Sequence, residues 1–133
     1  MSCQREFPDV QDLSPREAIH LTDTGKVIFI DVREPYEQSV SQLPGAITAE
    51  YFLDNAEKYT SFIKIGYSTI SYRSGLFAQA LQKNEIPVYN LRGGLLAWVH
   101  AGGRIYNGAG ETRRIHVYRQ EWDLAPASYE AVW

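Results

Sequence analysis

Short apolar runs alternate with helix-like segments along most of this chain, and that alternation constrains its fold more than any other feature. The runs at residues 26–31, 63–67 and 86–91 read KVIFID, IKIGY and IPVYNL. The first is apolar without interruption, as in strands that are buried on both faces of a parallel sheet. Strands that alternate with helices form parallel sheets with right-handed crossovers. The sequence therefore predicts an α/β fold with a central parallel sheet flanked by helices.

The first helix has clear start and stop signals. Ser14 and Glu17 form a capping box around Pro15, which suits the first helical position. We expect this helix to run to about Asp23 and to be ended by Gly25.

Weaker signals predict the remaining elements. Further helices are expected within residues 34–42, after an acidic cap at Asp54, over residues 74–84 and over residues 93–103. A small strand is expected after the turn at Pro44-Gly45. The buried face of the helix over residues 74–84 is expected to hold Leu76, Phe77, Ala80 and Leu81.

Composition argues against several classes of partner. With 133 residues and a formal net charge of −3, the chain suits one domain with an apolar core, and nucleic acid is not expected as a partner. No apolar run approaches the ~20 residues that cross a bilayer, so no membrane partner is expected. The first ten residues lack the apolar stretch of a signal peptide, and we expect a cytoplasmic protein.

Cysteine and histidine usage indicates no disulfide, metal or cofactor. Cys3 is the only cysteine, so an intramolecular disulfide cannot form. We expect it to be an exposed thiol near the terminus rather than a nucleophile. His20, His100 and His116 have no zinc-ligand spacing, and His116 lies in an alternating apolar pattern that suits a structural role.

The segment IKIGYSTISYRSGLFAQAL, residues 63–81, carries the strongest functional signal. It predicts a strand, a polar loop and a helix. In parallel sheets, ligands bind beyond the carboxyl ends of strands, where loop N–H groups and helix N-termini favour anions. We expect Ser68 to begin such a loop and the following residues to bind an anion: Thr69, Ile70, Ser71, Tyr72 and Arg73. Arg73 could hold an oxyanion through paired donors; an ordinary turn with a surface arginine is the alternative.

Four motifs, in this order along the chain, resemble the rhodanese family of single-domain sulfurtransferases. They are Asp31-Val32-Arg33, Pro44-Gly45-Ala46, Arg73-Ser74 and the run Gly93-Gly94-Leu95-Leu96-Ala97-Trp98. The likeness covers about residues 10–104 and implies the three-layer α/β domain of that family. The six-residue loop resembles the sulfur-handling members rather than the related phosphatases, whose loop is longer.

The sequence departs from the family pattern at the site itself. Ser68 stands where the resemblance places a cysteine nucleophile, and Ser71 stands where it places a loop glycine. Gln42-Leu43 replaces a histidine before Pro-Gly. If Ser71 takes a positive φ, its Cβ costs about 1 kcal/mol or more.

The resemblance implies a two-step reaction for the active family members. A cysteine thiolate takes the outer sulfur of thiosulfate as a persulfide and passes it to cyanide or a thiol. The partners it implies are therefore a small sulfur-containing anion or a thiol acceptor protein.

Ser68 changes what this chain can do. A serine hydroxyl is neutral at neutral pH, and its oxygen cannot form the persulfide, so we expect little or no sulfurtransferase activity. The alternative function is a non-catalytic binding or regulatory module that keeps the anion-binding loop. Both an engineered replacement and a natural inactive member would explain the serine.

Three charged residues are candidates for a supporting shell. Asp31 could accept loop N–H groups and Arg33 could form an ion pair near the site; a purely structural ion pair is the alternative. Arg92 is expected to brace a loop or lie on the surface.

The sequence pattern changes after Arg104. Residues 105–133 show no helical period and carry turn signals at Asn107-Gly108 and Gly110. We predict a domain over residues 1–104 and an extended C-terminal segment over residues 105–133 that packs on it. A segment that binds a protein partner or a second copy is the alternative.

Overall fold

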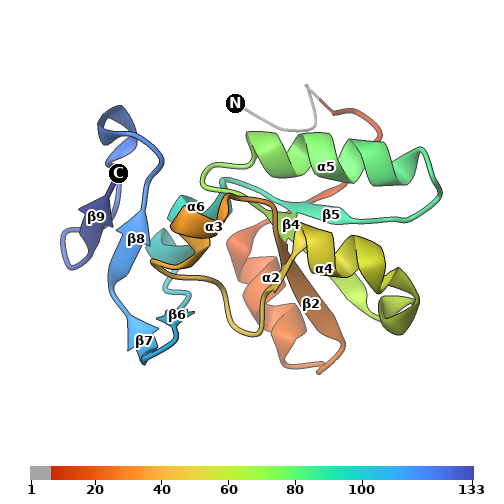
Figure 1. The fold of residues 1–133 in the computed structure, drawn as a ribbon, viewed down its shortest axis with the longest axis horizontal. Helices are drawn as coiled ribbons and strands as arrows, with labels where there is room; N and C mark the ends of the chain where they lie inside the picture. The colour runs from red at the N-terminus through yellow and green to blue at the C-terminus, as the bar shows by residue number, and fades with distance from the viewer. Residues whose placement is uncertain (1–6) are drawn as a thin grey trace.

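The computed structural model describes residues 7–133 and contains a five-stranded parallel sheet in the order β1-β5-β4-β2-β3 (Figure 1). The strands are β1 Asp12–Leu13, β2 Val27–Asp31, β3 Ile47–Thr48, β4 Ile63–Tyr67 and β5 Tyr89–Leu91. The helices around the sheet are α2 Pro15–Thr22, α3 Pro35–Gln38, α4 Ala49–Asp54, α5 Tyr72–Gln82 and α6 Gly94–His100, with a 3-10 turn, η1 Ala56–Tyr59. The predicted α/β fold with a central parallel sheet is confirmed.

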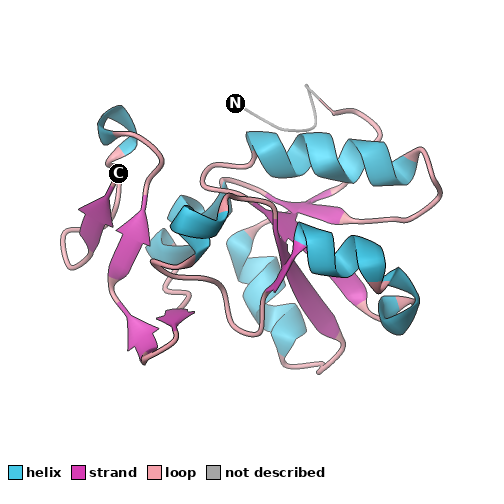
Figure 2. Ribbon diagram, in the orientation of Figure 1, coloured by secondary structure: helices cyan, strands magenta, loops and turns pink. Residues whose placement is uncertain are grey.

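Two buried clusters cover the two faces of the sheet, as the layers in Figure 2 show. Phe29 and Ile65 face a cluster that includes α2 and α6, whereas Ile30 faces a cluster that includes α4 and α5. Neighbouring residues of a strand point to opposite faces, so a strand covered on both sides must be apolar throughout. This is the reason why residues 27–30 form an uninterrupted apolar run.

The first helix forms as its capping signals predict. Ser14 Oγ accepts the main-chain N–H of Glu17, and the Glu17 carboxylate accepts the N–H of Ser14. Asp23 caps the end of α2, and Gly25 follows with φ 80°.

The predicted acidic cap at Asp54 is wrong. Asp54 is the last residue of α4, which begins instead after Thr48, whose Oγ1 accepts the N–H of Tyr51. The chain then passes through Asn55 into η1. Threonine is also a favourable N-cap, and the sequence prediction overlooked Thr48 at the end of the short strand.

The prediction for the buried face of α5 is right for Leu81 and in part for Phe77, which is half-buried against the core, and wrong for Leu76 and Ala80. Leu76 is 45% exposed and Ala80 is exposed, whereas the buried residues are Ser74, Gly75, Ala78 and Leu81. The ring of Phe7 lies so close to Gly75 that a Cβ there would overlap it. Small residues allow this close approach. Packing against Phe7 therefore decides which face of α5 is buried, and the spacing of the large apolar residues does not.

The C-terminal segment forms two small sheets beside the main one, at the blue end of the chain in Figure 1. β6 Ile105–Asn107 and β7 Gly110–Thr112 form an antiparallel hairpin, and β8 Arg114–His116 pairs in parallel with β9 Glu130–Val132. A 3-10 turn, η2 Gln120–Trp122, lies between β8 and β9. Ile115 and Val117 are fully buried in the cluster that contains Trp98.

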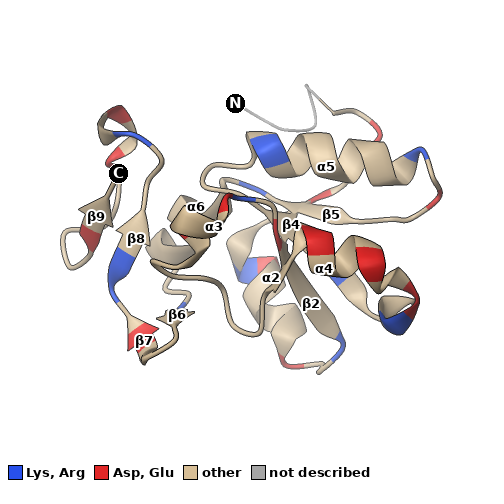
Figure 3. Cartoon of the chain, in the orientation of Figure 1, with Lys and Arg blue, Asp and Glu red and all other residues tan. Residues whose placement is uncertain are grey.

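Charged residues are interspersed along the helices, the strands and the C-terminal segment (Figure 3). Within residues 7–133, no helix is both long and apolar enough to cross a membrane. Cys3 lies outside the described residues.

Candidate functional site

The loop that follows β4 lies at the carboxyl edge of the sheet and is tied to the start of α6. The carbonyl of Ser68 accepts the N–H of Leu95 at 2.9 Å, and the carbonyl of Thr69 accepts the N–H of Leu96 at 3.1 Å. Gly94 has φ 62°, and a Cβ there would lie 2.6 Å from the Thr69 carbonyl oxygen and closer still to that of Ser68. A glycine is therefore required where α6 meets the loop.

We expect Gly94→Ala to destabilise the fold by about 2–4 kcal/mol, because the new Cβ meets backbone atoms that cannot easily move. Gly25→Ala is a matched control, since Gly25 also has positive φ but nothing lies within 4 Å of its Cβ position. That control should cost only about 1 kcal/mol. Urea unfolding measures both, and equal losses would show that the contact with the loop is unimportant.

The Ser68 side chain is buried inside a hydrogen-bonded network. Ser68 is 1% exposed; its Oγ lies 3.1 Å from Ser74 Oγ and accepts the Ser74 N–H at 3.2 Å. Ser74 Oγ donates to Asn90 Oδ1 at 2.5 Å, which leaves the Ser68 hydroxyl as the donor to Ser74. This network contains hydroxyl and amide groups, with no carboxylate or imidazole among its described members. It therefore offers no general base to the Ser68 oxygen.

Ser71 has a positive φ, as considered above for a position where the family pattern has a glycine. Its φ of 124° and ψ of −6° lie in a region that favours glycine. The Ser71 carbonyl accepts a hydrogen bond from Asn90 Nδ2 at 3.1 Å, and Ser74 Oγ lies 3.1 Å from the same oxygen. The loop keeps this conformation because buried polar partners hold it there.

Arg73 is bound by a buried glutamate that sequence reasoning missed. Its Nη1 and Nη2 donate to the two carboxylate oxygens of Glu37 at 2.7 and 2.9 Å, and Nη2 also donates to Thr69 Oγ1 at 3.1 Å. Burial alone raises the pKa of Glu37, but hydrogen bonds from Arg73 and from the Glu34 N–H outweigh it and lower the pKa. The paired donors of Arg73 therefore face Glu37, and the arginine braces the loop against α3.

Asp31 and Arg33 form a fully buried ion pair. Arg33 Nε and Nη2 donate to Asp31 Oδ1 and Oδ2 at 2.9 and 2.7 Å, and Arg33 Nη2 also reaches the Ser41 carbonyl at 2.7 Å. Tyr67 Oη donates to Asp31 Oδ2 at 2.7 Å, and burial followed by the Asp31 charge raises the Tyr67 pKa. The described contacts of the Asp31 carboxylate do not include residues 68–73; they join β2, β4 and the segment after α3.

Arg92 lies apart from the loop side chains. Its side chain is 54% exposed, and its Nε lies 3.8 Å from the buried Asp12 carboxylate. Its main-chain N–H donates to the Leu13 carbonyl at 2.8 Å, so the residue joins β1 to the end of β5.

Two aromatic residues of the C-terminal segment complete a small pocket over the loop. The pocket has a volume of about 120 Å³ and is lined by Ser68, Thr69, Ile70, Tyr72, Arg73, Tyr118 and Trp122. The rings of Tyr118 and Trp122 stack at 5.1 Å with an interplanar angle of 28°. The Arg73 guanidinium lies 4.8 Å from the Tyr118 ring centre.

His116 fixes the backbone that presents Tyr118. His116 is 5% exposed, and its Nδ1 accepts the N–H of Tyr118 at 3.0 Å, where Tyr118 has φ 79°. Burial lowers the pKa of His116 below 6.5; the Glu37 charge opposes this, and Arg33 and Arg73 add to it.

We expect stability to fall as the pH falls below about 6.5, because the unfolded chain then binds a proton that native His116 does not. The slope cannot exceed about 1.4 kcal/mol per pH unit for one proton. Urea unfolding from about pH 8 to about pH 5.5 measures it. His116→Asn should flatten the slope, whereas a change at the exposed His20, His20→Asn, should not; an unchanged slope in His116→Asn would contradict the assignment.

The site residues that the sequence analysis did not identify differ in whether any sequence signal points to them. Glu37 lies three residues after Glu34 and forms a capping box at α3, a spacing that could have revealed it. Asn90 lies in β5 near the same sheet edge as the loop, so topology could have suggested it. Tyr118 and Trp122 lie in a segment without periodicity, and no local signal connects them to the loop.

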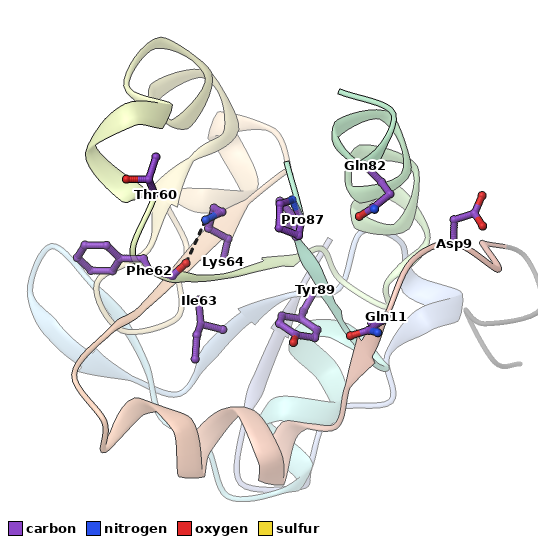
Figure 4. Close-up of a pocket in the computed structure, with 10 residues that line it drawn as sticks. Asp9, Gln11, Thr60, Phe62, Ile63, Lys64, Gln82, Pro87 and Tyr89 are labelled. Carbon is purple, nitrogen blue, oxygen red and sulfur yellow. Dashed lines mark hydrogen bonds between the residues drawn. The ribbon is translucent and has the colours of Figure 1, made fainter. Parts of the chain in front are cut away.

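A separate cavity of about 380 Å³ lies by the opposite ends of the strands (Figure 4). Ile63 and Tyr89, the first residues of β4 and β5, line it together with Lys64. Lys64 Nζ donates to the carbonyls of Tyr59 and Phe62 at 3.1 and 3.0 Å, and burial lowers its pKa. This lysine therefore closes the end of η1 and does not take part in the loop site.

Comparisons with known proteins place the loop in a family context. A family model described as the rhodanese-like domain matches residues 14–101. No curated protein matches the chain significantly. A protein of unknown function from Rhodopseudomonas palustris, described as a possible tyrosine phosphatase, is similar at 26% identity with a TM-score of 0.63; the match covers 76% of this chain and 88% of that one.

Two further structures share the fold. Thiosulfate sulfurtransferase from Pseudomonas aeruginosa has a TM-score of 0.68 and 24% identity over 90% of this chain, which spans only 24% of that protein. A rhodanese-like domain protein from Staphylococcus aureus has a TM-score of 0.59 and 24% identity over 67% of this chain and 91% of its own. The family match includes β2 to β5 of the parallel sheet, but not β1. It also includes the loop after β4 and the helix α6 that the loop contacts. The chain therefore belongs to the rhodanese-like domain family.

Proposed function

We propose that this chain is a sulfurtransferase-family domain that binds a small anion at residues 68–73 and does not transfer sulfur in this form. The observation that carries the proposal is the state of Ser68, whose oxygen is buried and hydrogen-bonded to Ser74 with no base beside it. Sulfur transfer needs a thiolate that attacks the outer sulfur of thiosulfate. A new sulfur–sulfur bond forms as the old one breaks, and sulfite leaves with the electron pair. An oxygen at position 68 cannot form that product.

The loop retains features that favour an anion. Among the described residues, the main-chain N–H groups of Ile70, Tyr72 and Arg73 have no hydrogen-bond partner within the protein. Tyr72 and Arg73 begin the eleven-residue helix α5, whose free N–H groups and dipole attract negative charge. Arg73 lines the same pocket, but its guanidinium is paired with Glu37, so the attraction for an anion rests on the main-chain N–H groups.

A titration of the Cys3→Ser protein with sodium thiosulfate tests both halves of the proposal. We expect the NMR amide signals of residues 69–73 to shift with saturation, and sodium chloride at matched ionic strength to leave them in place. Intact-mass measurement after the same incubation should show no added sulfur atom. Unmoved amide signals would refute anion binding, and a persulfide adduct would refute catalytic silence.

The second candidate is an active sulfurtransferase whose nucleophile is a cysteine at position 68. The retained loop conformation favours it, because Ser71 keeps the positive φ and the loop carbonyls keep their bonds to α6. A phosphatase is less well supported, because the loop between β4 and α5 is short.

A further inference from the structure

The pocket over the loop has two walls of different origin. One wall is the loop itself, which lies within residues 14–101 matched by the family model. The other is formed by Tyr118 and Trp122, which lie beyond that region; we call these two residues the aromatic wall. The part of the chain that the family model describes therefore leaves the site open on one side.

The aromatic wall is held firmly in place. β8 pairs with β9 in parallel, and the N–H of Val117 donates to the Val132 carbonyl at 2.8 Å. His116 Nδ1 holds the N–H of Tyr118 in a left-handed conformation that a tyrosine rarely adopts. Such a constraint persists only when surrounding contacts enforce it, which indicates that the position of the ring is specified.

The pocket is small, and two arginines lie near its rings, one of them paired with Glu37. Its volume of about 120 Å³ is well below the about 300–1,000 Å³ of pockets for larger ligands. Arg73 lies over one ring of the wall, and Arg119 lies 5.4 Å from the centres of both rings. The space suits a compact anion, and a thiol carried by a folded protein would have to bring its backbone past the two rings.

We propose that the aromatic wall determines the specificity of this site, admitting anions of about the size of thiosulfate and excluding protein-borne thiols and bulky ligands. This inference rests on the proposed function, because it concerns the same loop pocket. It assigns the C-terminal segment a role in ligand selection.

The test measures access to position 68 by thiol labelling. In a Cys3→Ser/Ser68→Cys protein the only thiol lies at the base of the pocket, and we compare its labelling rates with iodoacetamide and with fluorescein maleimide. With the wall intact, the large reagent should react far more slowly, relative to its rate with free cysteine, than the small one does. Adding Trp122→Ala should speed the large reagent by about tenfold and change the small one by less than about threefold, because the indole blocks only the larger approach.

Two further variants make the result decisive. Trp133→Ala is a matched control on the same segment, since Trp133 is exposed and does not line the pocket; it should leave both rates unchanged. Tyr118→Gly removes the other ring and suits the positive φ, so it should fold even if Trp122→Ala does not. Similar rates for both reagents with the wall intact would overturn the inference and point to an open surface for a protein partner.

The labelling readout is independent of the proposed function. Failure of the thiosulfate titration would refute anion binding while leaving the ratio of labelling rates measurable. A ratio that neither Trp122→Ala nor Tyr118→Gly changes would refute the aromatic wall even if thiosulfate binds.

Discussion

A protein carrying Ser68→Cys is expected to show thiosulfate:cyanide sulfurtransferase activity at least about 1,000-fold above that of the unsubstituted chain. The substitution supplies the sulfur atom that the persulfide requires. The site also favours the reactive thiolate, because loop N–H groups and the start of α5 can lower a cysteine pKa from ~8.5 to ~3.5–7.5. The measurement is the initial rate of thiocyanate formation in a Cys3→Ser background.

Controls for this prediction separate the nucleophile from the shape of the loop. Ser68→Ala should remain inactive. Adding Ser71→Gly to Ser68→Cys should preserve or raise the rate, because glycine adopts φ 124° without the Cβ penalty of about 1 kcal/mol. Comparable rates for the unsubstituted chain and for Ser68→Cys would contradict the assignment of residue 68. If only the double variant is active, Ser71 also silences the site.

Asp31→Asn is expected to lower the free energy of unfolding by about 3–5 kcal/mol, the usual cost of breaking a buried ion pair. The amide leaves the fully buried Arg33 guanidinium without the countercharge that it contacts at 2.7 Å. It also weakens the acceptor for Tyr67 Oη. Domains are stable by about 5–15 kcal/mol in total, so the loss is a large fraction of the whole.

Urea unfolding followed by circular dichroism measures this effect. Asp54→Asn is the matched control, because Asp54 is exposed and has no ion pair among the described residues; its effect should stay within about 0.5 kcal/mol. Tyr67→Phe should cost an intermediate amount, about 1–3 kcal/mol, because the Leu43 N–H that bonds Tyr67 Oη is left unpaired. If Asp31→Asn lowers the free energy of unfolding no more than Asp54→Asn does, the buried ion pair does not stabilise the fold.

The sheet could be predicted from sequence because its signals are local and redundant. β2 is apolar over its first four residues, β4 is mostly apolar and directly precedes a polar loop, and α2 has both halves of a capping box around Pro15. The prediction failed at the start of α4, where Thr48 and not Asp54 is the cap. It also failed where packing against a distant residue decides, as for Phe7 and α5.

The candidate site was predictable only in part. The position of the loop and the positive φ of Ser71 follow from strand order and from the family pattern. Its polar partners were harder to predict, because Glu37, Asn90 and Ser74 reach the loop from separate elements, and local spacing or topology hints at a residue without showing that it contacts the loop. The aromatic wall was the least visible part, since pairing between β8 and β9 positions it and neither strand has a strong sequence signal.

That pairing of β8 with β9 has a consequence for the order in which the protein can assemble during synthesis. A ribosome releases the chain from the N-terminus, and every strand of the five-stranded sheet precedes residue 92. The sheet can therefore form on the ribosome while residues 130–132, which anchor β8, are still unmade. A nascent chain at that stage would have the strands of the sheet but not β9, so β8 and the aromatic wall that follows it would lack their anchor.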